Sequence, residues 1–229
     1  MKKPTLIVLH GALGSKKQLE PISKKLSSNF EVYSLDFQGH GGTSLPLEYS
    51  IELFTQNLKE FLDNNDLSQV YIFGYSMGGY VALNLARKDN RIKQIFTLGT
   101  KFHWTPESAS HEVKMLNPDK IEEKVPAFAK ALADRHEPQD WKKVMSMTAD
   151  MMIALGNNPV LTKTTLKEVN IPVTIAWGDQ DNMVTEEESE QAASYIPGAE
   201  FITFYGFRHP IEQVDIDELS STITKTFLK

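Results

Sequence analysis

The chain has 229 residues, 41% of them hydrophobic, which is enough for one large α/β domain with its own core. A formal net charge of −6 argues against a nucleic-acid or anionic-membrane partner. Cysteine is absent, which excludes disulfides, a thiol nucleophile and thiolate metal ligands.

The N-terminal apolar run covers only residues 6–9 before it meets His10 and Gly11. This run is too short for the core of a signal peptide and far too short to span a bilayer. We therefore expect a cytoplasmic protein that acts on a small molecule and has no membrane or nucleic-acid partner.

Apolar runs and amphipathic segments alternate along the first hundred residues. The first run, over residues 5–10, is continuous, which is typical of a strand buried on both faces of a parallel sheet. Ser15 and Ser50 each precede a segment with helical spacing and are predicted helix caps. Strands are predicted to begin at residues 5, 31, 70 and 92, and a buried helix is predicted over 80–86.

A Gly-x-Ser-x-Gly motif over residues 74–78 lies between the third strand and its helix. The turn around Ser76 must be tight, and Gly74 and Gly78 supply the space. The motif alone is weak evidence, because an ordinary turn with a capping serine has the same pattern. Its context favours a nucleophile held at a helix N-terminus, where developing negative charge is stabilised.

From residue 101 to residue 165 the alternation stops, and helical stretches are separated by prolines. The alternation then resumes with predicted strands at 172–177 and 200–205. We predict a doubly wound, mostly parallel α/β sheet of about six strands, built by residues 1–100 and 166–229. Residues 101–165 are predicted to form a small helical cap insertion.

In such a sheet the working loops lie at the carboxyl ends of the strands. A serine nucleophile needs a base, and the base needs an orienting acid. His209 follows the sixth strand and is the predicted base. Asp179 and Asp181 follow the fifth strand; Asp181 is preferred as the acid, and either could be a turn former.

The intermediate of acyl transfer carries an oxyanion that needs preplaced hydrogen-bond donors. The backbone N–H of Met77 follows the nucleophile and is one predicted donor. The second is expected after the first strand, from Ala12, with Leu13 possible; this assignment rests on position alone.

Substrate contacts are expected from the loops and from the insertion. The expected residues are Leu13, His103, Trp104 and Met145, because apolar and methionine side chains suit an adaptable pocket. Packing within the cap itself explains these side chains equally well. His40 is expected to brace its own loop. No metal-ligand spacing and no phosphate-binding loop is found, so no metal or cofactor is expected.

Several motifs together resemble the α/β-hydrolase superfamily, and more narrowly its small capped bacterial members: esterases, proline iminopeptidase-like and haloperoxidase-like enzymes and the menaquinone-pathway synthase. The resemblance covers residues 1–100 and 166–229. It implies a catalytic triad of Ser76, Asp181 and His209, in the chain order described for this fold. It also implies an oxyanion hole from the Ala12 and Met77 amides. The motifs are His10-Gly11, Asp36-x-x-Gly-His-Gly41, Gly74-Tyr-Ser-Met-Gly78, Gly178-x-x-Asp181 and the late histidine.

The chain departs from the family pattern near the base. The family usually has glycine directly before the histidine, whereas Phe207 and Arg208 separate Gly206 from His209. Gln38 also stands where the family often has arginine or proline.

The predicted reaction is the cleavage of a small, uncharged-tail carboxylic ester or related acyl compound through an acyl-enzyme. Two alternatives remain open. The same triad could hydrolyse a carbon–carbon bond or serve a lyase reaction. The pocket could also bind a small signalling molecule without turnover, since fold analogy cannot choose a substrate.

Overall fold

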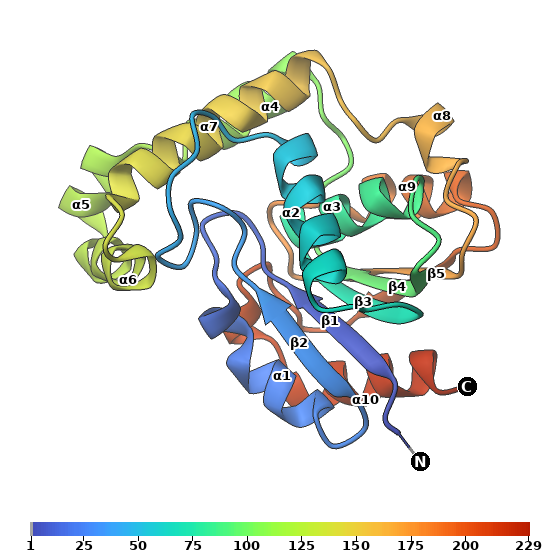
Figure 1. Ribbon diagram of the computed structural model, residues 1–229. Helices are drawn as coiled ribbons and strands as arrows, with labels where there is room; N and C mark the ends of the chain where they lie inside the picture. Colours follow the sequence, from blue (N-terminus) through green and yellow to red (C-terminus); the bar gives the residue numbers. More distant parts are fainter. Residues whose placement is uncertain (1) are drawn as a thin grey trace.

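Six parallel strands form one sheet in the computed structural model, which describes residues 2–229 (Figure 1). Every neighbouring pair is parallel, which confirms the predicted doubly wound α/β architecture. In their order across the sheet the strands are β2 (Glu31–Leu35), β1 (Thr5–Leu9), β3 (Val70–Tyr75), β4 (Ile92–Leu98), β5 (Val173–Gly178) and β6 (Glu200–Phe204).

The direction in which strands are added reverses between β1 and β3. The chain places β2 on one side of β1 and then crosses to add β3, β4, β5 and β6 on the other side. Loops that follow β1 and β3 therefore lead away in opposite directions and leave a crevice between them. Ligands of open α/β sheets bind at such a switch point.

Two layers of helices cover the sheet (Figure 1). One face packs against α1 (Glu20–Leu26) and α10 (Ile216–Phe227). The other face packs against α2 (Ile51–Asn64), α3 (Met77–Ala86) and α9 (Glu186–Tyr195). Two short 3-10 helices, η1 (Lys16–Leu19) and η2 (Ile211–Gln213), complete the connections.

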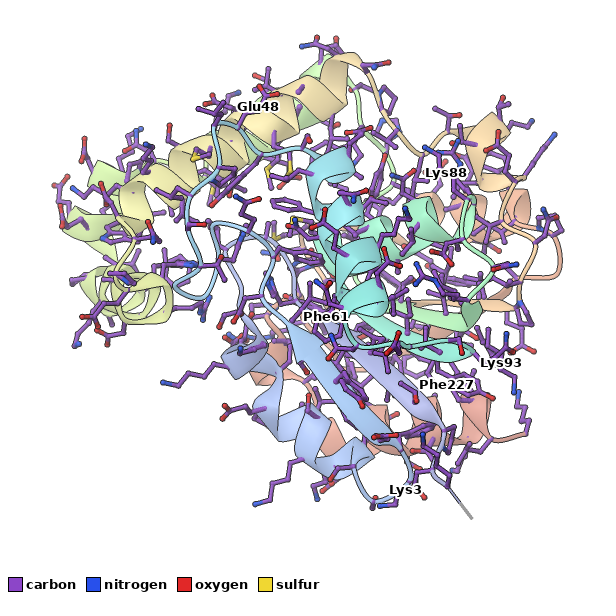
Figure 2. All side chains as sticks on the ribbon, viewed as in Figure 1. Lys3, Glu48, Phe61, Lys88, Lys93 and Phe227 are labelled. Atoms are coloured by element: carbon purple, nitrogen blue, oxygen red, sulfur yellow. The ribbon has the colours of Figure 1, made fainter. Side chains whose placement is uncertain are left out.

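The strand β1 shows why its apolar run is continuous. Leu6 and Val8 are buried in the core beside α1 and α10, whereas Ile7 and Leu9 are buried in the core beside α2 and α3. Successive side chains of a strand point to opposite faces, so a sheet covered on both sides needs apolar residues at every position. On the α10 side, Phe227 packs against Phe30, Tyr71 and Phe96. Figure 2 labels Phe227 among the side chains of the whole chain.

Five helices lie between β4 and β5, within the segment predicted as an insertion. They are α4 (Pro106–Val113), α5 (Pro118–Lys124), α6 (Pro126–His136), α7 (Trp141–Asn157) and α8 (Lys163–Leu166). The prolines at 106, 118 and 126 each stand in a first helical turn, where the missing N–H costs nothing. Within residues 2–229, no helix combines the length and apolarity that a membrane span requires.

The two predicted helix caps have different outcomes. The Ser50 side chain accepts a hydrogen bond from Leu53 N at 3.1 Å, as predicted. The Ser15 prediction is wrong, because its hydroxyl caps nothing and has no partner among the described residues. The chain enters η1 there as a 3-10 turn, which Gln18 N closes onto the Ser15 carbonyl instead.

The turn between β3 and α3 leaves no room for extra atoms. A Cβ added to Gly74 would lie 2.5 Å from the Cα of Gly79, and one added to Gly78 would lie 2.6 Å from the carbonyl oxygen of Leu9. The first residues of α3 therefore pack directly against the backbone of β1. This close approach places the tip of the turn beside the loop that follows β1.

We predict that Gly78→Ala lowers the free energy of unfolding by about 2–3 kcal/mol, because the new methyl group overpacks a backbone contact that cannot yield. The matched control is Gly198→Ala. Gly198 has a φ of +72° but no atom within 4 Å of the added Cβ, so only about 1 kcal/mol of backbone strain is expected. Urea unfolding measures both variants. Equal losses in the two variants would contradict the close-packing argument.

Candidate active site

Ser76 forms the tip of the β3–α3 turn in a strained conformation. Its φ of 52° and ψ of −120° lie in a region that residues with a side chain rarely adopt. The shortest hydrogen bonds of this backbone hold both its N–H and its carbonyl. Ser76 N donates to the Leu98 carbonyl at 2.8 Å, and the Ser76 carbonyl accepts from Thr100 Oγ1 at 2.9 Å and from Gly79 N at 3.0 Å. Strain of this kind persists only where the surroundings determine it, and it is common at functional sites.

His209 lies on the loop between β6 and η2 and is almost completely buried. Its Nδ1 is 2.8 Å from Asp181 Oδ2, and the two side chains are only 10% and 3% exposed. The Tyr75 hydroxyl donates to the His209 carbonyl at 2.7 Å. Hydrogen bonds therefore hold His209 both at its backbone carbonyl and at its imidazole ring.

The two residues that interrupt the family pattern before His209 are accommodated by burial of one of them. Phe207 is buried and stacks on Phe204 with 4.4 Å between ring centroids. The Phe207 carbonyl accepts a hydrogen bond from Gln180 N at 3.0 Å. The longer loop is thus anchored to the sheet rather than extended into solvent.

Of the two candidate acids, the structure brings Asp181 to the histidine. Asp181 Oδ1 accepts hydrogen bonds from the amides of Met183 at 2.8 Å and Val184 at 3.0 Å, which turn Oδ2 toward His209. Asp179 accepts from the Gly206 amide instead, and so closes the β5–β6 loop pair.

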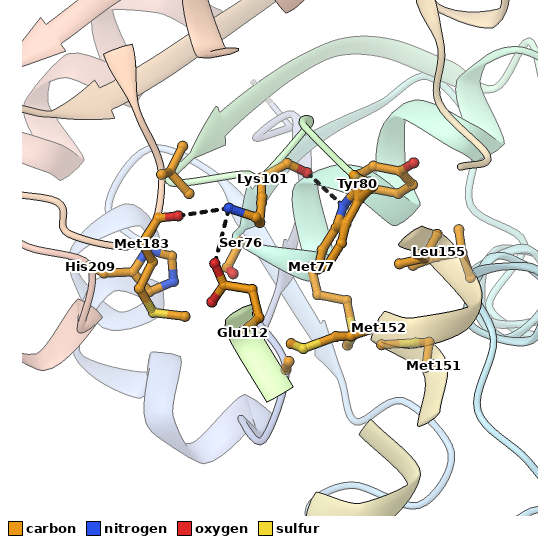
Figure 3. Close-up of a pocket in the computed structure, with 14 residues that line it drawn as sticks. Ser76, Met77, Tyr80, Lys101, Glu112, Met151, Met152, Leu155, Met183 and His209 are labelled. Carbon is orange, nitrogen blue, oxygen red and sulfur yellow. Dashed lines mark hydrogen bonds and ion pairs between the residues drawn. The ribbon is translucent and has the colours of Figure 1, made fainter. Parts of the chain in front are cut away.

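Ser76 and His209 line one pocket together with Ala12 and Met77 (Figure 3). No hydrogen bond joins the Ser76 hydroxyl to His209 within residues 2–229. Met77 is the first residue of α3, so its N–H has no acceptor within the helix. Ala12 follows β1 in the turn that Gly14 N closes onto the Gly11 carbonyl at 3.1 Å. Both amides therefore belong to backbone that meets at the switch point of the sheet.

Three buried histidines lie behind this pocket. The ring centroid of His40 is 5.2 Å from that of His10 and 5.7 Å from that of His136, and His40 stacks on Tyr49. Burial lowers the pKa of His10 and of His136 to about 4, and it holds the pKa of His40 well below its ordinary value. All three are neutral at pH 7, so each can both donate and accept a hydrogen bond.

The hydrogen bonds of two of these histidines define their tautomers. Phe37 N donates to His10 Nε2 at 3.1 Å, so the proton is on Nδ1, which donates to the Gly11 carbonyl at 2.8 Å. Gly41 N donates to His136 Nδ1 at 3.3 Å, so Nε2 donates to the Leu13 carbonyl at 3.1 Å. Both histidines therefore hold carbonyls of the loop that contains Ala12.

The pocket is small and mostly apolar. Its volume is about 50 Å³, and α7 supplies part of its wall (Figure 3). Its apolar lining includes Trp104, Met151, Met152, Leu155, Met183 and Val184.

Of the four expected substrate contacts, only Trp104 lines the pocket. Met145 is fully buried, two turns before Met152 on the same face of α7, about 10 Å further along the helix. His103 faces a separate groove beside α8 and α9. The Leu13 side chain is buried in the core and its carbonyl is turned toward α6. The structure therefore does not bring Met145, His103 or Leu13 to the lining of this pocket.

An ion pair that the sequence analysis missed borders the pocket. Lys101 Nζ lies 3.0 Å from Glu112 Oε1 of α4 and donates to the Met183 carbonyl at 3.0 Å (Figure 3). Lys101 comes three residues after the end of β4, so the rule that working residues follow strands could have identified it. Glu112 had no such signal, because its partner lies outside its own helix. Within residues 2–229, no group of three histidine or acidic side chains is placed to hold a metal ion.

The model of a known family, described as "alpha/beta hydrolase fold", matches residues 4–137, which is more than half of the chain. Carboxylesterase YbfK of Bacillus subtilis is 25% identical over 232 residues, with 92% of this chain and 76% of that protein covered. A probable alcohol acetyltransferase of Wickerhamomyces anomalus is 36% identical over 80 residues, which cover 34% of this chain. The chain spans only about a quarter of the acetyltransferase, since 24% of that protein is covered.

Solved structures show the same fold across almost the whole chain. The 2-hydroxy-6-oxo-6-phenylhexa-2,4-dienoate hydrolase from Rhodococcus sp. strain RHA1 matches with a TM-score of 0.81. The match covers 99% of this chain and 91% of that one, at 19% sequence identity. At this identity the similarity concerns the fold alone.

We predict that His136 makes stability depend on pH. Its pKa is about 4 in the folded protein against about 6.5 when unfolded, so the unfolded chain binds more protons between these values. Its contribution is complete above about pH 6.5 and is lost as the pH falls toward 4. The neighbouring charges are Arg135 and Asp36, and His10 titrates in the same range.

The measurement compares the wild type with His136→Gln, whose amide can still donate to the Leu13 carbonyl but does not titrate. Between pH 7 and pH 4 the wild type should lose up to about 3 kcal/mol more unfolding free energy than the variant. Identical pH dependence of the two proteins would contradict a neutral, buried His136.

Proposed function

The chain belongs to the alpha/beta hydrolase fold family, and from this premise we propose that it is a serine hydrolase of small carboxylic esters. The proposed catalytic residues are Ser76 as nucleophile, His209 as base and Asp181 as orienting acid. One observation carries the proposal: the buried Asp181–His209 hydrogen bond ends at the same pocket as the strained Ser76.

The hydrogen bond to Asp181 decides which nitrogen of His209 acts as the base. With Nδ1 2.8 Å from the carboxylate, the proton of the neutral ring stays on Nδ1 and Nε2 keeps its lone pair. Nε2 would take the proton from Ser76 Oγ as that oxygen bonds to the substrate's carbonyl carbon. Asp181 would then stabilise the imidazolium that forms.

The tetrahedral intermediate places a negative charge on the former carbonyl oxygen. The proposed oxyanion hole consists of the Ala12 and Met77 amides, supported by their place on the pocket lining and at the N-terminus of α3. When the intermediate collapses, His209 gives its proton to the leaving alcohol and the acyl group remains on Ser76. Water, activated by His209, would release the acid.

The size and lining of the pocket support a short, uncharged acyl group. The pocket has a volume of about 50 Å³. One water molecule needs about 10–15 Å³, so the pocket suits a group of a few heavy atoms. The partial match to an alcohol acetyltransferase supports a short acyl group as well. We propose that α4 and α7, within residues 101–165, form a cap over the pocket. Glu112, Met151 and Leu155 line the pocket and support this role.

We predict that a fluorophosphonate probe adds once to the wild type and not to Ser76→Ala, as measured by intact-mass spectrometry. Short-chain nitrophenyl ester turnover should fall at least about 10³-fold in Ser76→Ala. No adduct on well-folded wild type would refute the nucleophile and favour a binding protein. An adduct without acyl-enzyme accumulation or ester turnover would favour carbon–carbon cleavage or lyase chemistry.

Two neighbouring aspartates provide a matched pair for the acid. Asp181→Asn should lower kcat about 10³–10⁴-fold, because the amide no longer holds the Nδ1–H tautomer. Asp179→Asn removes a charge from the same loop but not from His209, and kcat should change less than about 10-fold. The reverse pattern would reassign the acid to Asp179.

Chain-length preference tests the substrate class. Across a series of nitrophenyl esters, kcat/KM should be highest at two to four acyl carbons and fall at least about 10-fold by ten carbons, because the pocket cannot take up the extra methylenes. Preference for long or highly charged acyl groups would contradict the proposed substrate class.

A further inference from the structure

Arg135, near the end of α6, joins two loops of the candidate site, and we propose that it is a positioning residue for both. One loop carries the Ala12 amide and the other carries His209. This inference rests on the proposed function, because it assigns a purpose to the positions of those two groups. Arg135 contacts neither Ser76 nor the pocket, so its effect on the reaction would be indirect.

The guanidinium of Arg135 reaches one acceptor in each loop. Nη1 donates to the Leu13 carbonyl at 2.8 Å, and Nη2 lies 3.3 Å from Glu212 Oε1. Leu13 follows Ala12 directly, and Glu212 comes three residues after His209. The Arg135 side chain is only 16% exposed, so water competes weakly for these contacts.

The loop after β1 needs this support because its backbone is strained. Leu13 has a φ of 56°, which residues with a side chain rarely adopt. Its carbonyl accepts two hydrogen bonds from α6, from Arg135 Nη1 and from His136 Nε2. Such a conformation persists only where neighbouring groups determine it. Removal of the Arg135 bond would let Leu13 relax.

Relaxation of Leu13 would change the direction of the Ala12 amide. The Ala12 N–H and the Gly11 carbonyl belong to one planar peptide unit and point in opposite directions. That carbonyl is held by His10 Nδ1 and by Gly14 N, so Ala12 and Leu13 lie inside one closed four-residue turn. A rotation at Leu13 therefore cannot occur without movement at Ala12.

The contacts of Arg135 with Leu13 and Glu212 form a bridge between the two loops. The Glu212 end of this bridge fixes the start of η2. Glu212 Oε1 also accepts a hydrogen bond from Gln18 Nε2 of η1 at 2.8 Å. Glu212 is therefore held from α6 and from the segment that follows the Ala12 loop. The planar guanidinium can direct separate N–H groups to the two acceptors at once, which a lysine ammonium on a flexible stem does less well.

The test compares Arg135→Gln and Arg135→Lys with Lys130→Gln. Lys130 lies on the same helix and pairs only with Asp134 on its exposed face. For each folded variant, kcat and KM for a short ester are measured, together with the affinity for a trifluoromethyl ketone. Such a ketone adds to the serine and forms an oxyanion, so its affinity reports on the oxyanion donors.

In both Arg135 variants, kcat should fall about 10–100-fold while KM changes less than about 3-fold. This fall in kcat is no larger than the fall caused by removal of one oxyanion donor. Affinity for the trifluoromethyl ketone should fall in parallel with kcat. Lys130→Gln should match the wild type. If Arg135 only anchors α6, its variants would melt at lower temperature but keep wild-type kcat, and the proposal would be overturned. Full recovery of kcat in Arg135→Lys would also overturn it.

Glu212→Gln keeps the test decisive if the Arg135 variants do not fold. The Glu212 side chain is half exposed, so its loss should not prevent folding, and kcat should fall about 3–10-fold with KM unchanged. An unchanged kcat would show that the bridge does not position the His209 loop. If the wild type gains no fluorophosphonate adduct at Ser76, the proposed function itself is wrong. If the wild type gains the adduct but the Arg135 and Glu212 variants behave as the wild type, only the proposed positioning role of Arg135 is wrong.

Discussion

The close packing of the β3–α3 turn against the end of β1 is the constraint on which the other features of the site depend. Gly74 and Gly78 allow backbone to approach backbone, and Ser76 between them has a φ of 52°. Because the strand order reverses between β1 and β3, this turn stands beside the loop that carries Ala12. Met77, the first residue of α3, and Ala12 then line one pocket. The sheet topology alone therefore brings these two backbone segments together.

The charges around this site are few and each has a partner. Asp181 is held by two backbone amides and by His209, and Lys101 is paired with Glu112. The three histidines behind the pocket are neutral because burial lowers their pKa values. Neutral rings can hold carbonyls and amides of two loops without placing a charge near the proposed oxyanion position. This arrangement also joins α6 of the insertion to the loop after β1, so the insertion contributes support as well as pocket wall.

The sequence predicted well what depends on local pattern. Short runs rich in apolar, β-branched and aromatic residues identified all six strands, and the Gly-x-Ser-x-Gly spacing identified the turn at Ser76, because both follow from residues close together in the chain. It left Asp179 and Asp181 open, since loop closure by Phe207 and Gly206 decides which carboxylate turns toward His209. It missed Glu112, Arg135 and His136, and it expected Met145 at the pocket, whose lining does not include it, because each depends on how the helices between β4 and β5 dock on the sheet. Helical periodicity gives the buried face of a helix but not its partner.

A crystal structure of the protein after reaction with a small phosphonate would test the central claim most directly. The account predicts phosphorus bonded to Ser76 Oγ, with the phosphonyl oxygen about 2.7–3.1 Å from the nitrogens of both Ala12 and Met77. It also predicts His209 Nε2 within hydrogen-bond reach of Ser76 Oγ or the leaving-group position. A phosphonyl oxygen turned away from these amides, or an adduct on another residue, would contradict the account.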